Sequence, residues 1–300
     1  MDYHNTFTDT RAGRVLLTKD RSAAAAFASS GGCVIGVCPE EELRTIDFPE
    51  AYVLAAEEEP LSQAFIEKAA CHFYRRPFTV AVTDRLTVRE SIGDDYRAIF
   101  SLLQRCADGR IFADGFSLEE IDTEEKFLQY VNACYHFFGF GVWTVLLKDL
   151  KKGDDNAPAE KEESGSGSGG RSRASSVIGW CGLYPKKDAE EEGYHVELGY
   201  AIDPAFQRKG YAYEACRAIL AYAEKETGLR QVLLKTDADN AASGALAKKL
   251  GFTLQESGDI QPQCVKDDDG MADPADQKCA GNPETYLLKL PEGMNGEEAL

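Results

Sequence analysis

The first 80 residues alternate short apolar runs with segments whose composition favours helices. The apolar runs lie at residues 15–17, 33–37 and 51–55. Residues 19–29 are rich in alanine and residues 60–74 repeat apolar side chains at helical spacing, so both are predicted to be helices. Because strands separated by helices usually pair in parallel, residues 1–80 are expected to form a small half-Rossmann-like α/β module.

A second pattern begins near residue 81. Residues 85–89 alternate apolar and basic side chains, as expected for a strand with one buried face. Further strands are predicted at residues 143–147, 177–183, 196–202, 231–235 and 286–290. Helices are predicted at residues 94–106, 123–137, 211–227 and 241–250. This order predicts a second domain of the α/β (α+β) class over residues 81–290.

Two stretches interrupt the second domain, near residues 148–176 and 257–284. Both have almost no large apolar side chains, and the first contains the run SGSGSGG. Such segments bury too little apolar surface to offset the entropy lost on ordering. They are expected to be flexible insertions, and residues 291–300 a frayed tail.

Composition excludes several classes of partner. A formal net charge of −18 repels nucleic-acid phosphates and would attract amines, although it could equally serve only solubility. The chain has no apolar run long enough to span a membrane and no apolar leader at its start. Its nine cysteines form no C-x-x-C pair and its four histidines no zinc pattern. We expect a cytoplasmic protein with no metal, nucleic-acid or membrane partner; its oligomeric state is not indicated.

The most informative stretch is ELGYAIDPAFQRKGYAYE, residues 197–214. A strand is predicted to end at Asp203, and a helix to begin after Gly210. The first turn of a helix presents unpaired N–H groups and the positive end of its dipole, which suits a pyrophosphate. Gly210 lets the backbone approach a ligand closely, and Arg208 and Lys209 add positive charge. Taken alone, these residues are better explained by an ordinary strand-to-helix turn.

Gln207, Gly210 and Ala212 match the Q/R-x-x-G-x-G/A signature of the GNAT superfamily of acyl-CoA transferases. Other segments resemble the ribosomal-protein N-terminal acetyltransferase branch, namely TDRLTVRE, VIGWCGL, ELGYAIDP and LAKKLGF. The resemblance covers roughly residues 82–290 and implies a GNAT-type mixed central sheet flanked by helices. Residues 1–80 faintly resemble part of a HAD-type Rossmann fold but carry no D-x-D-x-[TV] nucleophile motif, so we favour a structural or oligomerising role for them.

The resemblance implies a cofactor site for acetyl-CoA. In the family, backbone amides of the fourth strand hold the pantetheine arm and polarise the thioester carbonyl, and the loop after that strand holds the pyrophosphate. Asn240 would contact the cofactor as well as cap a helix. The cofactor-binding residues implied here are Ala201, Ile202, Asp203, Gln207, Arg208, Lys209, Gly210, Tyr211, Ala212 and Asn240.

Two side chains are candidates for acid–base catalysis. Glu197 is the first candidate for the general base that deprotonates the amine, with His195 as the second. Each could instead have only a structural role. Glu197 could pair with a basic side chain, and His195 could be a partly exposed residue at the edge of the sheet. Ser243, three residues after Asn240, is the candidate acid that protonates the CoA thiolate, a role proposed for serine in this branch. Capping of the helix is the alternative for Ser243.

These residues together predict an acyl-CoA-dependent N-acyltransferase. It would transfer acetyl from acetyl-CoA to a primary amine, on a small molecule or a protein N-terminus, by direct attack in a ternary complex. No covalent intermediate and no metal are needed. The alternative is a non-catalytic acyl-CoA-binding or regulatory module with the same fold.

Overall fold

The computed structural model describes residues 5–58, 60–106, 121–148, 176–187, 194–255 and 283–291. The chain divides into two compact units, Met1–Phe78 and Thr79–Leu300. The insertions expected near 148–176 and 257–284 and the tail at 291–300 lie outside the described residues except at their ends.

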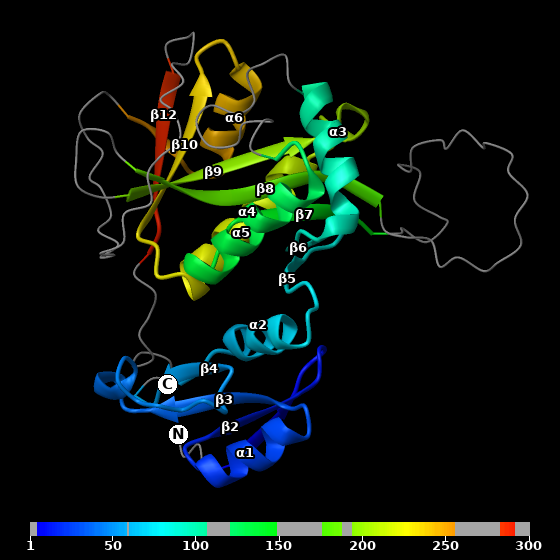
Figure 1. The fold of residues 1–300 in the computed structure, drawn as a ribbon. Helices are drawn as coiled ribbons and strands as arrows, with labels where there is room; N and C mark the ends of the chain where they lie inside the picture. The colour runs from blue at the N-terminus through cyan, green and yellow to red at the C-terminus, as the bar shows by residue number, and fades with distance from the viewer. Residues whose placement is uncertain are drawn as a thin grey trace, which may run out of the picture. The chain divides into compact units, whose positions relative to one another are not determined.

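The first unit is a four-stranded sheet with one helix on each face (Figure 1). Its elements are β1 (Thr6–Asp9), β2 (Arg14–Thr18), α1 (Arg21–Ser29), β3 (Cys33–Cys38), a 3-10 turn (Glu40–Glu42), β4 (Val53–Ala56) and α2 (Gln63–Phe73). Strands β2, β3 and β4 are parallel, as expected, whereas β1 pairs antiparallel with β2 and was not predicted. Asp20 starts α1 because its carboxylate accepts the N–H groups of Ser22 and Ala23.

The second unit is built on an eight-stranded sheet with the order β11-β12-β10-β9-β8-β7-β6-β5. Its strands are β5 (Thr79–Val82), β6 (Leu86–Glu90), β7 (Val142–Leu147), β8 (Ser176–Lys187), β9 (Tyr194–Ile202), β10 (Gln231–Asp237), β11 (Thr253–Leu254) and β12 (Pro283–Lys289). Its helices are α3 (Tyr96–Cys106), α4 (Glu124–Phe137), α5 (Tyr211–Glu226) and α6 (Ala241–Lys249), with 3-10 turns at Gly93–Asp95 and Pro204–Phe206. Among the described strands of this sheet, only β9 and β10 pair in parallel, which confirms the predicted mixed sheet flanked by helices.

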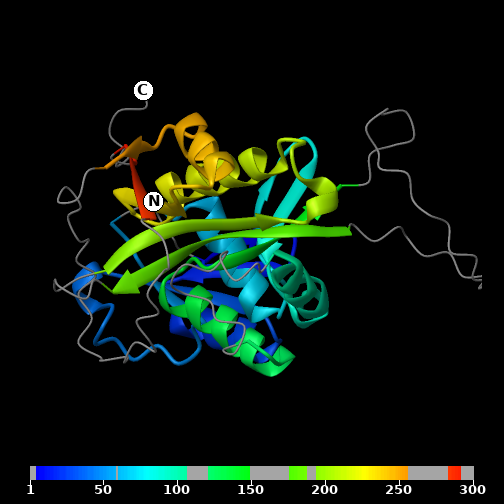
Figure 2. The same ribbon diagram turned by 90° about the horizontal axis from the view of Figure 1, so that it is seen from above.

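Helices cover both faces of this sheet. Figure 2 shows α5 and α6 on one side of strands β8 and β9, and α3 and α4 on the other. On the α5 side, Sγ of Cys216 lies 3.6 Å from Sγ of Cys181 on β8, and the ring of Tyr222 packs edge-on against Trp143 of β7. Side chains alternate between faces along a strand, so each β9 residue can be assigned to the α3/α4 face or the α5/α6 face from its cross-strand partner.

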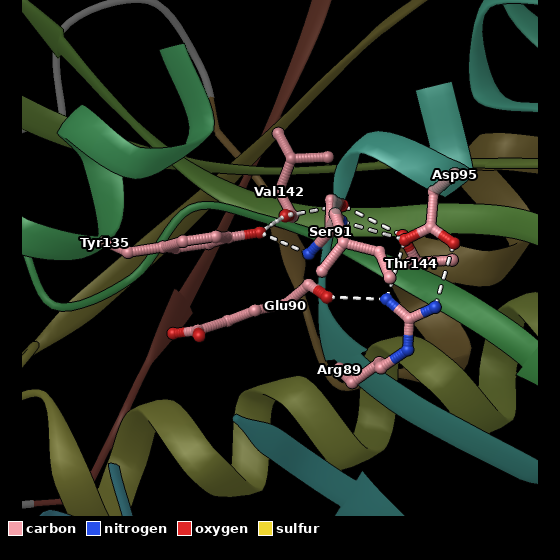
Figure 3. A network of polar contacts seen from close by, with 8 residues as sticks. Arg89, Glu90, Ser91, Asp95, Tyr135, Val142 and Thr144 are labelled. Atoms are coloured by element: carbon pink, nitrogen blue, oxygen red, sulfur yellow. Dashed lines mark hydrogen bonds and ion pairs between the residues drawn. The ribbon is translucent and has the colours of Figure 1, made fainter. Parts of the chain in front are cut away.

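A buried polar network fixes the start of α3 to the sheet (Figure 3). Arg89 of β6 donates two hydrogen bonds to the carboxylate of Asp95, at 2.6 and 2.8 Å. Asp95 also accepts a hydrogen bond from Thr144 of β7, and Thr144 bonds to Ser91. The Ser91 N–H donates to the hydroxyl of Tyr135 on α4. The network joins β6, β7 and α4 around the ion pair of Arg89 and Asp95, whose side chains are 16% and 4% exposed.

Candidate active site

Strands β9 and β10 part soon after they meet. They are registered at Glu197 and Leu233, whereas β9 pairs with β8 along its whole length, from Tyr194 to Ile202. The β9 edge that faces β10 is therefore open after Glu197, at the end of the strand that leads to the loop before α5.

Backbone alternation shows which amides face this opening. The N–H of Asp203 donates to the carbonyl of Ile178 at 2.8 Å, so Asp203 and, two residues earlier, Ala201 direct their backbone groups toward β8. Tyr200 and Ile202 then direct theirs toward β10. Of the three backbone positions expected to hold the cofactor, Ile202 faces the opening, whereas Ala201 and Asp203 face β8. Tyr200 was not anticipated, because the sequence does not indicate which edge of a strand is left open.

The loop after β9 reaches α5 through Gly210. Gly210 has a φ of +83°, and α5 begins there without a side-chain cap. This is the left-handed region that glycine adopts readily, and the N–H groups of the first helical turn stay exposed to a ligand. Arg208 is exposed and also has a positive φ, of +59°. Gln207 donates to the carbonyl of Ile202 at 2.8 Å, so its side chain holds the loop to the strand rather than pointing outward.

Three residues of this loop differ in where their side chains lie. Lys209 donates to the carbonyl of Ala205 at 3.1 Å and covers the ring of Phe206. Tyr211 is buried, so its ring belongs to the core and its backbone N–H is the part left for a ligand. Ala212 is half-buried and keeps the first turn of α5 small.

Arg85, in the turn between β5 and β6, holds the loop that joins β9 to α5. Its guanidinium donates to the carbonyl of Lys209 at 3.0 Å and to Glu214 of α5 at 2.7 Å, and it lies over the ring of Tyr211. Glu214 also accepts hydrogen bonds from the hydroxyl of Thr83 and the N–H of Arg85. Burial would raise the pKa of Glu214, but these hydrogen bonds and the charge of Arg85 outweigh it and lower the pKa. This contact joins residues far apart in sequence. In the sequence, Arg85 and Glu214 stand out only as parts of two separate motifs, which do not show that the two side chains meet.

Glu197 lies in a buried cluster of ionisable groups on the α3/α4 face of β9. Its side chain is 8% exposed, and one carboxylate oxygen lies 2.7 Å from Nε2 of His195 and 2.8 Å from Nζ of Lys235 on β10. Burial alone would raise the pKa of Glu197, but the hydrogen bond with His195 and the charge of Lys235 lower it below its ordinary value. The Glu197 carboxylate is therefore ionised at neutral pH. Lys235 was not anticipated from the sequence.

Ser243 lies on the other face, in the first turn of α6. Its N–H donates to Oδ1 of Asn240 at 3.1 Å, so Asn240 caps the helix. Its hydroxyl accepts a hydrogen bond from the Tyr200 hydroxyl, also at 3.1 Å. Cross-strand partners share a face, and Tyr200 pairs with Cys181, which packs on α5. Glu197 and Ser243 therefore lie on opposite faces of the same open strand.

No group of three or more His, Cys, Asp or Glu side chains suited to a metal ion occurs among the described residues. In the same part of the chain, no helix is both long enough and apolar enough to cross a membrane.

The chain is similar in sequence to known acetyltransferases. The model of the acetyltransferase (GNAT) domain matches residues 85–253. The uncharacterised N-acetyltransferase YnaD of Bacillus subtilis is 40% identical over 56 residues, which are 19% of this chain and a third (33%) of YnaD. The uncharacterised N-acetyltransferase YoaA of the same organism is 24% identical over 58% of this chain and 83% of YoaA. Among solved structures, the ribosomal-protein-S5-alanine acetyltransferase of Vibrio fischeri is 14% identical over 71% of this chain and 97% of that one, with a TM-score of 0.46.

Proposed function

Because the chain belongs to the GNAT acetyltransferase family, we propose that it transfers the acetyl group of acetyl-CoA to a primary amine. The observation that carries this proposal is the opening between β9 and β10, which leads directly to the uncapped start of α5. An extended thioester-bearing arm fits an open strand edge, and a pyrophosphate fits exposed helix N–H groups.

The proposed cofactor contacts follow the course of β9 into α5. The N–H groups of Tyr200 and Ile202 would bind the pantetheine arm and the thioester carbonyl. The backbone from Gln207 to Ala212 would bind the pyrophosphate, helped by the charge of Arg208. Asn240 would position the start of α6 beside the thioester.

In the proposed reaction, the amine nitrogen attacks the thioester carbon while its proton passes to Glu197, directly or by way of His195. The carbonyl oxygen becomes an oxyanion, which a fixed backbone N–H on β9 stabilises. The carbon–sulfur bond then breaks, and its electron pair leaves on sulfur, which takes a proton from Ser243. The placement of Glu197 and Ser243 on opposite faces of β9 supports this division, because the amine and the leaving thiolate need separate approaches.

The acceptor class is an amine-bearing small molecule or a protein N-terminus. A screen of CoA release tests this proposal, using acetyl-CoA with polyamines, amino acids, aminoglycosides and peptides that begin with different residues. We expect release to depend on one class of amine and to vanish with its N-acetylated form. Tight binding of acetyl-CoA without release for any amine would favour the non-catalytic acyl-CoA-binding or regulatory module instead.

A further inference from the structure

We propose that Tyr200 is a positioning residue that fixes the hydroxyl of Ser243 so that its proton points to the departing CoA thiolate. The proposal rests on the function argued above, and on the 3.1 Å hydrogen bond by which the Tyr200 hydroxyl donates to Oγ of Ser243. This bond connects the strand that borders the opening with the helix that follows β10.

The direction of the hydrogen bond determines what Ser243 can do. The Tyr200 hydroxyl donates to Oγ of Ser243 at 3.1 Å. Burial raises the pKa of Tyr200 to about 12, so the hydroxyl keeps the proton that it donates in this bond. Ser243 Oγ then receives one proton and retains its own for another acceptor. Among the described residues, no protein group accepts that second proton, which leaves it for a ligand.

The surroundings hold Ser243 in place. Its backbone is fixed by the Asn240 cap, and the next residue, Gly244, packs so closely that a Cβ there would lie 2.9 Å from the hydroxyl of Tyr286 on β12. Ser243 itself is only 9% exposed. With its backbone held by the cap, Ser243 keeps the rotation of its hydroxyl, which the bond from Tyr200 restricts.

The bond also favours the chemistry of the leaving group. When the carbon–sulfur bond breaks, sulfur takes the proton of Ser243, and negative charge develops on Oγ. A hydrogen bond donated to that oxygen strengthens as the charge grows, because hydrogen bonds to ionised groups are stronger than neutral ones. Ser243 then recovers a proton from water, and Glu197 releases the amine's proton to water, so the only net change is amine plus thioester to amide plus thiol.

A double-mutant cycle tests the proposal, with kcat measured at saturating acetyl-CoA and amine. We expect Ser243→Ala to lower kcat by roughly 100-fold, at the low end for loss of an acid or base. Tyr200→Phe removes only the hydroxyl and should lower kcat about tenfold. In Ser243→Ala, adding Tyr200→Phe should cause no further loss, because Tyr200 acts through Ser243. In Ser243→Thr, which keeps a hydroxyl, Tyr200→Phe should again lower kcat.

The controls separate this mechanism from loss of structure. Rates are divided by the concentration of acetyl-CoA-binding sites, so a partly unfolded variant is still counted correctly, and Tyr222→Phe on α5 serves as a matched change at another half-buried tyrosine. Normal kcat in Tyr200→Phe beside a slow Ser243→Ala would overturn the positioning role but leave the proposed function standing. Full activity in Ser243→Ala would show that Ser243 is not the acid, which also overturns the role proposed for Tyr200. Additive losses in the double variant would show that Tyr200 acts independently of Ser243, which also contradicts the proposal.

Discussion

The surroundings of Glu197 favour the ionised form of its carboxylate over the protonated form. Nε2 of His195 and Nζ of Lys235 both contact the same carboxylate oxygen. Glu197→Gln keeps the shape of the side chain and removes its basicity. We expect kcat to fall by roughly 10²- to 10⁴-fold while the Kd of acetyl-CoA changes only a few-fold. The loss should shrink at high pH, where more of the amine is already neutral. Steady-state rates and calorimetry measure both quantities.

Glu125→Gln, on the exposed start of α4, is the matched control and should leave kcat unchanged. If folded Glu197→Gln turned over normally, Glu197 would not be the base, and His195 would become the first candidate.

The same carboxylate should make stability depend on pH. Because its pKa is lowered in the folded chain, Glu197 stabilises the fold above its ordinary pKa of 4.5, and this contribution is lost as pH falls from there through the folded pKa. Over that window the free energy of unfolding should change less steeply in Glu197→Gln, by up to about 1.4 kcal/mol per pH unit. Urea titrations followed by tryptophan fluorescence report it, since both tryptophans, Trp143 and Trp180, lie in the second unit. Identical pH dependence in the two proteins would contradict the ion cluster.

At the scale of elements, α5 depends on a left-handed residue at each end. Gly210 precedes it with a φ of +83°, and Gly228 follows it with a φ of +66°. Valine is strained at either position, but only Gly210 lies where the pyrophosphate is proposed to bind. Gly210→Val should therefore raise the Kd of acetyl-CoA at least tenfold, about 1.4 kcal/mol, as measured by calorimetry.

Gly228→Val carries the same backbone strain at the far end of α5, so it should lower the melting temperature without changing the Kd. Equal affinities of folded Gly210→Val and the unmodified protein would place the anion site elsewhere.

At the scale of the whole molecule, the two units have separate cores. The larger core runs from Leu86 to Leu290, and a smaller one around Ala24, Val34 and Phe48 belongs to the first unit. We propose that the second unit carries the transferase and that residues 1–80 have a structural or oligomerising role. A chain of residues 79–300 should then fold by itself and bind acetyl-CoA within a few-fold of the full chain. Calorimetry and melting curves test this, and loss of binding in a folded fragment would assign part of the site to the first unit.

Much of this protein could be predicted from local sequence. The helices α2, α4 and α5 and the long strands follow the spacing of apolar residues, and α1 follows from its alanine-rich composition; both depend only on a single element. The turn at Gly210 could also be predicted, because its conformation is one that glycine adopts with little strain. The short strands β1, β5 and β11 were missed, since two to four residues at a sheet edge are too few to show a period.

What the sequence determined alone was the order of the longer helices and strands and the strand–loop–helix that begins α5, because both arise from neighbouring residues. The tertiary structure decided which groups meet there. The parting of β9 from β10, the contact of Arg85 with Glu214 and the bond from Tyr200 to Ser243 join residues 36 to 129 positions apart. Contacts at such separations depend on how the strands pair and where the helices pack. Short sequence patterns do not determine either arrangement.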